Sequence, residues 1–75
     1  MSQDRISISP DICNGRPVVA GTRITVHTVL EFLAAGDPID EVLEAYPTLT
    51  RDDVLACLNY ASQLMNRPFS IKAIA

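Results

Sequence analysis

Between residues 26 and 66, apolar side chains recur every three or four positions, and Gly36 and Pro47 interrupt the pattern twice. A helix makes one turn in about 3.6 residues, so this spacing gathers apolar side chains on one face. The two interruptions divide the stretch into three helices. Short helices with one apolar face must pack against one another, so the pattern predicts a mostly α, three-helix bundle over residues 26–66.

The ends of these helices also have recognisable signals. Thr25 suits the N-cap of the first helix, and Asp37 can cap the second with Pro38 at its first helical position. Thr50 precedes two carboxylates and suits the N-cap of the third. The second and third helices, joined by a short turn, have helix-turn-helix proportions. The third helix is expected to bury a stripe made of Val54, Leu55, Leu58, Ala61, Ser62 and Met65.

Residues 1–25 predict a different local structure, an arm with short strands. Residues 6–8 alternate apolar and polar side chains, and residues 17–21 form an extended run. Between them, Asn14 and Gly15 form a turn dipeptide that tolerates positive φ. Such short strands need a sheet partner. A second copy of the arm could supply it, so we expect this segment to contribute to a homodimer.

The size of the chain also favours association. A chain of 75 residues buries only about 60% of its unfolded surface, and partner subunits often supply the missing stability. Cys57 is expected to be a small core residue, whereas Cys13 lies in a loop. No signal peptide or apolar run of about 18 residues is apparent. We therefore expect a cytoplasmic protein with reduced thiols and no membrane contact.

The charges are unevenly distributed. The net charge is −3, and residues 26–66 carry seven carboxylates against one arginine. Phosphate contacts should therefore come from the ends of the chain. In the third helix, two carboxylates near its start would repel phosphates, and the helix could equally serve only for packing. Arg23 could bind phosphate or tie the arm to an acidic helix of its own domain. The predicted DNA-binding residues are Arg16, Thr22, Arg23, Arg51 and Asn59.

Catalytic chemistry has little support in the sequence. His27 is the only histidine, and no serine or cysteine is placed beside it as a nucleophile. The carboxylates are explained by solvation, helix capping and the helix dipole. No metal-ligand spacing or glycine-rich phosphate loop is present. We therefore expect a binding protein without catalytic residues, metal or cofactor.

Residues 67–75 form a tail after the third helix, which Pro68 prevents from continuing far. The tail could be a disordered terminus or a strand folded back on the domain. It could also be a segment that a partner protein orders by burying its apolar side chains. On this third interpretation the partner-binding residues are Arg67, Phe69, Ile71, Lys72 and Ile74.

The arm contains a specific motif. Its residues read Gly15-Arg16-Pro17-Val18-Val19-Ala20-Gly21-Thr22-Arg23-Ile24-Thr25-Val26. This run resembles the signature of the bacterial and archaeal domain of unknown function 433, and the resemblance continues to about residue 67. It implies a homeodomain-like helix-turn-helix fold. Within the motif, glycines permit backbone conformations closed to other residues, so Thr22 and Arg23 are presented from a rigid turn.

The resemblance also implies a function. That family is commonly interpreted as the antitoxin half of type II toxin–antitoxin pairs. It implies a PIN-like ribonuclease toxin as partner, operator DNA that the chain binds to repress its own operon, and hetero-oligomers of toxin and antitoxin. The expected toxin-binding residues are those of the tail. Two alternatives stay open: a helix-turn-helix transcriptional regulator without a protein toxin, and a plain dimerisation module.

Overall fold

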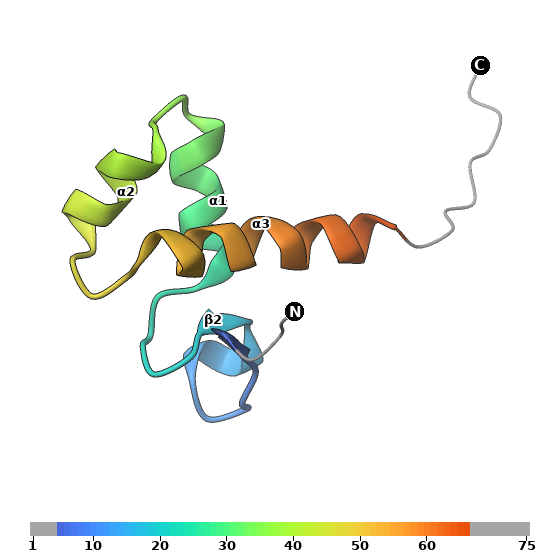
Figure 1. Ribbon diagram of the computed structural model, residues 1–75. Helices are drawn as coiled ribbons and strands as arrows, with labels where there is room; N and C mark the ends of the chain where they lie inside the picture. The colour runs from blue at the N-terminus through green and yellow to red at the C-terminus, as the bar shows by residue number, and fades with distance from the viewer. Residues whose placement is uncertain (1–4, 67–75) are drawn as a thin grey trace, which may run out of the picture.

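The computed structural model describes residues 5–66, in which three helices follow a small two-stranded sheet (Figure 1). The predicted mostly α, three-helix arrangement with a short-stranded N-terminal arm is confirmed, and α2, the turn and α3 have helix-turn-helix proportions. The elements in chain order are β1 (Ile6–Ser7), the 3₁₀ turn η2 (Cys13–Gly15), β2 (Val18–Val19), α1 (Val26–Ala34), α2 (Ile39–Ala45) and α3 (Arg51–Met65).

Two of the three predicted N-caps are confirmed. The Thr25 hydroxyl accepts a hydrogen bond from the Thr28 N–H at 3.0 Å at the start of α1. At the start of α3, Thr50 and Asp53 form a capping box. The Asp53 N–H donates to the Thr50 hydroxyl at 3.2 Å, and the Thr50 N–H donates to the Asp53 carboxylate at 2.9 Å. Two N–H groups that a helix start leaves without partners are thus satisfied.

The predicted start of α2 is wrong by one residue. Pro38, not Asp37, is the N-cap, and the helix begins at Ile39. The reason lies at the end of α1, where Gly36 adopts a φ of +98°. The Gly36 N–H donates to the Leu33 carbonyl, and the Asp37 N–H donates to the Phe32 carbonyl. These two bonds form a Schellman motif, which commits Asp37 to the preceding helix.

The strands of the arm find their partner within the chain. β1 and β2 pair antiparallel, with Ile6 opposite Val19 and Ser7 opposite Val18. A further bridge joins Val18 to Thr25, just before α1. The suggestion that a second copy supplies the sheet partner is therefore corrected, because β1 and β2 are each other's partner in the sheet. Between them, Asn14 and Gly15 take positive φ values, as the turn prediction required.

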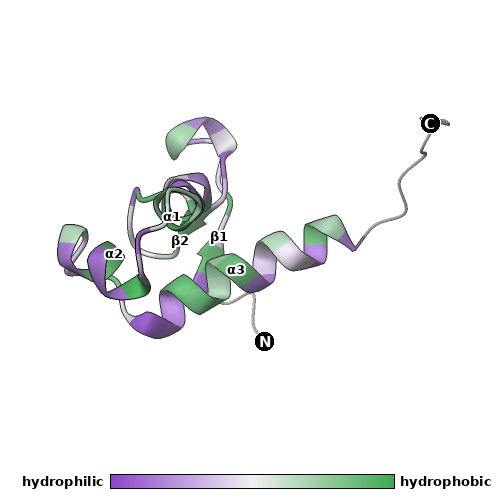
Figure 2. Ribbon diagram, turned by 90° about the horizontal axis from the view of Figure 1, so that it is seen from above, coloured by the Kyte–Doolittle hydropathy of each residue, from purple (hydrophilic) through white to green (hydrophobic). Residues whose placement is uncertain are grey.

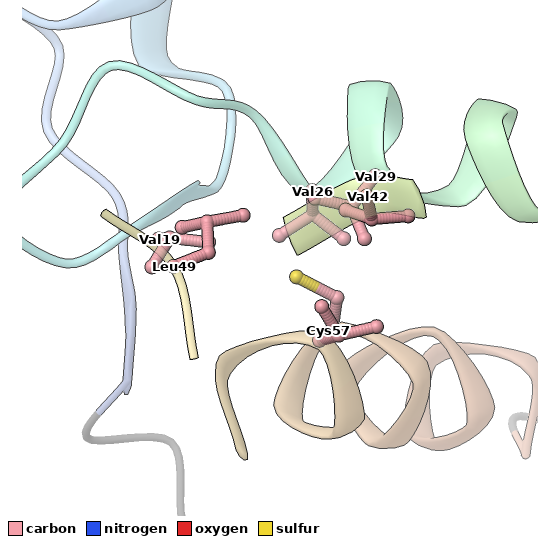
Figure 3. Close-up of a cluster of buried hydrophobic side chains, with 7 residues drawn as sticks. Val19, Val26, Val29, Val42, Leu49 and Cys57 are labelled. Atoms are coloured by element: carbon pink, nitrogen blue, oxygen red, sulfur yellow. The ribbon is translucent and has the colours of Figure 1, made fainter. Parts of the chain in front are cut away.

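The core lies where the three helices and β2 meet (Figure 3). α3 packs against both α1 and α2, and Cys57 points from α3 toward the valines of those helices. Cys57 is fully buried, which confirms its prediction as a core residue. The arm contributes directly, because both residues of β2 are buried. The buried apolar residues are Val18, Val19, Val26, Val29, Val42, Leu49, Val54 and Cys57.

Arg5 joins the arm to the start of α3. Its guanidinium lies 2.9 Å from the Asp53 carboxylate and 3.7 Å from that of Asp52. Burial alone would raise the pKa of Asp53. The hydrogen bond from the Thr50 N–H opposes this effect, as do the Arg5 guanidinium and the Thr50 hydroxyl, and together they hold the pKa below its ordinary value.

This lowered pKa predicts an acid-sensitive link between the arm and α3. A carboxyl group with a depressed folded-state pKa contributes stability that is present above its unfolded pKa, near 4, and is lost as the pH falls through the folded value. The free energy of unfolding, measured by urea titration, should therefore fall less steeply below about pH 4 in the Asp53→Asn variant than in the unmodified chain. Asp11→Asn, at an exposed carboxylate, is the control. Equal acid sensitivity in both variants would contradict the prediction.

Candidate functional site

A groove of about 350 Å³ lies between the start of α1 and the C-terminal half of α3. We call it the α1–α3 groove. Its lining is mostly apolar, with an arginine from the arm and the only histidine of the chain among its residues. The lining residues are Arg16, Pro17, Val26, His27, Leu30, Tyr60, Ala61 and Leu64.

Local backbone contacts bring the arm to this groove. The Arg16 N–H donates to the Cys13 carbonyl at 3.1 Å and closes the η2 turn. The Val26 N–H then donates to the Pro17 carbonyl at 2.9 Å, which fixes Pro17 beside the first turn of α1. Arg16 is exposed, and its guanidinium has no hydrogen bond or ion pair within residues 5–66. The groove thus combines an apolar lining with an available cation.

His27 also lines this groove. Its imidazole lies 3.2 Å from the Glu31 carboxylate, one turn further along α1, and both side chains are about two-thirds exposed. His27 is therefore a surface residue.

A second depression, of about 440 Å³, lies within the arm, and two of the predicted DNA-binding residues line it. The Thr22 hydroxyl already makes hydrogen bonds within the arm: it donates to the Val19 carbonyl at 2.8 Å and accepts from the Ile24 N–H at 3.0 Å. Arg23 is exposed, and no ion pair involves it in the described part of the chain. The tie to an acidic helix that was considered for Arg23 is made instead by Arg5, a residue that sequence reasoning did not select.

The remaining predicted DNA-binding residues lie elsewhere. The Arg51 guanidinium donates to the Asp40 carboxylate at 2.8 Å and joins the start of α3 to α2. Asn59 is exposed in the middle of α3. The structure therefore distributes the five residues over the arm, the start of α3 and its middle. The predicted partner-binding residues Arg67, Phe69, Ile71, Lys72 and Ile74 lie outside the described residues.

The predicted core stripe of α3 needs correction. Val54 is buried as expected, but Leu55, Leu58 and Met65 are among the large apolar side chains that remain exposed. The reason is geometric. α1, β1 and β2 lie on one side of α3 (Figure 2), and the C-terminal half of α3 continues past α1 (Figure 1). Cys57, which the predicted stripe omitted, occupies the central position instead.

Within residues 5–66, no group of three or more histidine, cysteine, aspartate or glutamate side chains is arranged to hold a metal ion. In the same part of the chain, the helices are too short or too polar to cross a bilayer.

Comparison with known proteins places this fold in a family. Residues 6–61 match the profile of the family described as Protein of unknown function (DUF433). The chain belongs to this family. The match runs from β1 into the C-terminal half of α3, so it includes the arm, the helix-turn-helix and most of the α1–α3 groove.

Two relatives match most of the length of this DUF433 chain. It is 38% identical over 60 residues to a protein named "Uncharacterized protein y4eO" from Sinorhizobium fredii (strain NBRC 101917 / NGR234), a match that covers 80% of this chain and 27% of that protein. It resembles the crystal structure of a DUF433 member from Anabaena variabilis ATCC 29413 with a TM-score of 0.77 and 38% identity. That match covers 81% of this chain and 60% of the other. The chain thus corresponds to part of each longer relative.

The two thiols should differ sharply in reactivity. Burial raises the pKa of Cys57 to about 11, and the Asp53 charge adds to the effect. Cys13 is only half-buried, and its thiol donates to the Arg23 carbonyl at 3.4 Å. Because the thiolate is the reactive form, a chromogenic disulfide reagent at pH 8 should label Cys13 at least about tenfold faster than Cys57. Cys13→Ser should remove the fast phase, and urea should abolish the difference. Rapid labelling of the folded Cys13→Ser variant would contradict the prediction.

Proposed function

We propose that this chain is an antitoxin that binds and neutralises a PIN-like ribonuclease in the cytoplasm. The observation that carries the proposal is the α1–α3 groove, in which an apolar lining lies beside the available guanidinium of Arg16. A surface of this kind suits a protein partner that offers an apolar side chain next to a carboxylate. The ribonuclease is the partner that the family resemblance implies.

The electrostatics support a protein partner with acidic groups. Most of the other arginines in residues 5–66 are engaged: Arg5 with Asp52 and Asp53, and Arg51 with Asp40. Arg16 and Arg23 make no ion pair within these residues, so their guanidinium groups can bind carboxylates of a partner. A PIN-like active site is a cluster of carboxylates around a metal ion, and a guanidinium can bind such carboxylates in bidentate geometry. A cation held there would compete with the catalytic metal.

The tail is proposed as the second part of the toxin-binding surface. In sequence it follows α3, whose last turns carry Leu64 in the groove lining. Phe69, Ile71 and Ile74 would add apolar anchors, and Lys72 a further cation. Groove and tail together would then form one continuous toxin-binding surface.

Ribonuclease inhibition tests the two parts separately. The assay first checks the product of the neighbouring reading frame for ribonuclease activity, and it then titrates the chain against that activity. The Arg16→Ala variant should inhibit the ribonuclease about tenfold more weakly, because it loses a hydrogen bond to a charged group. Deletion of residues 67–75 should weaken it at least as much. Arg51→Ala, at an exposed arginine paired with Asp40, is the matched control and should inhibit normally. Undiminished inhibition by both the Arg16 variant and the deletion would overturn the proposed surface.

A DNA-binding regulator is the second candidate, and the two arm arginines favour it. Arg16 and Arg23 are exposed, and both lie outside the ion pairs of residues 5–66. The start of α3 is a poor reader of DNA, because Asp52 is exposed and Arg51 is already paired with a carboxylate. Operator contacts would therefore come from the arm, and two copies would double its positive charge.

A gel-shift titration on the chain's own promoter tests this second candidate. If Arg16 and Arg23 each contact a phosphate, each alanine variant should weaken binding and reduce the slope of log affinity against log salt by about 1 per subunit. Arg51→Ala is again the control. If the chain does not bind the promoter at low salt, or if neither substitution changes the affinity, the arm is excluded as the DNA contact.

A further inference from the structure

Three exposed apolar side chains form a row on α3 that the α1–α3 groove does not use. Leu55, Leu58 and Met65 are between 40% and 66% exposed, and none of them lines that groove. Together with exposed Ser62, their positions follow the spacing i, i+3, i+7 and i+10, which places them on one face of a helix. We call Leu55, Leu58, Ser62 and Met65 the α3 stripe.

The part of α3 that carries the stripe has no charged residue. The sequence from residue 54 to residue 66 contains no lysine, arginine, aspartate or glutamate, although one residue in five of the whole chain is charged. Figure 2 shows white and green colouring over much of this part of α3, in contrast to the purple start of the helix. A helix face that only meets water usually carries charged residues. A long uncharged stretch with exposed leucines is instead typical of an interface.

The geometry points to a second copy of this chain as the occupant: we propose that two copies pair through the α3 stripe with their α3 helices antiparallel. The stripe positions are symmetric about residue 60, so a two-fold axis there sets Leu55 opposite the partner's Met65 and Leu58 opposite the partner's Ser62. The small serine gives the facing leucine room to pack.

Charge selects both the surface and the direction. Each copy has a net charge of −3, so two copies repel least where their surfaces carry no charge. α3 begins with Arg51, Asp52 and Asp53, whose charges sum to −1, and the next charged residue in the sequence is Arg67. A parallel pair would bring the aspartates of both copies together. An antiparallel pair brings the acidic start of one helix to the end of the other, from which the sequence continues with a cation.

Disulfide cross-linking tests the direction. Leu55→Cys and Met65→Cys are placed separately in a Cys13→Ser background, where the remaining native thiol, Cys57, is buried. The two positions are ten residues apart, or about 15 Å along a helix, whereas a disulfide joins Cα atoms within about 7 Å. Under mild oxidation, a mixture of the two variants should cross-link, and each variant alone should not. Self-linking of the Leu55→Cys chain, or no linking in the mixture, would overturn the proposal.

Light scattering during size-exclusion chromatography tests the surface. The unmodified chain should have the mass of two copies at micromolar concentration, and Met65→Arg should weaken dimerisation at least about tenfold. Ile8→Arg replaces a comparably exposed apolar side chain outside α3 and should leave the dimer intact. Circular dichroism verifies that both variants keep their helices. A single-chain mass for the unmodified protein, or equal effects of the two substitutions, would contradict the pairing.

These experiments use the chain without toxin or DNA. A failure of the antitoxin proposal would therefore leave the pairing through the α3 stripe unaffected, and a monomeric chain could still inhibit a ribonuclease through the α1–α3 groove.

Discussion

The contact of α3 with α1 and α2 is the packing on which the rest of the molecule depends. Val29, Val42, Val54 and Cys57 are completely removed from water where these helices meet. In so small a domain, few other side chains can replace them. Their burial fixes the angle at which α3 leaves the body, and that angle decides which residues of its C-terminal half face the arm and which face solvent.

The sequence predicts the helices well because their signals are local. Thr25, Gly36 and Thr50 act on N–H and carbonyl groups within one turn, so each can be recognised from its neighbours. The start of α2 was misplaced because Asp37 could serve either helix. The Schellman motif, which requires φ of Gly36 to be positive, settles that competition.

Long-range features were harder to predict. An apolar period indicates a helix face, but it does not say how wide a part of that face the neighbours cover. The period therefore predicts Leu55 and Leu58 as core residues, although the buried residues of α3 are Val54 and Cys57. The Arg5–Asp53 pair spans 48 positions, and no local pattern announces it. The α1–α3 groove likewise joins Arg16 to Leu64, so sequence reasoning found the cation but not the cavity beside it.

The walls of the α1–α3 groove come from both ends of the described chain, and this has a consequence for turnover in the cell. The groove exists only while the whole domain is folded, so any ligand of the groove binds the native state alone. By linkage, such a ligand lowers the population of opened chains in proportion to its occupancy. Proteases that cleave opened chains would then degrade the unliganded protein faster than the complex. The lifetime of the protein would follow the supply of its ligand.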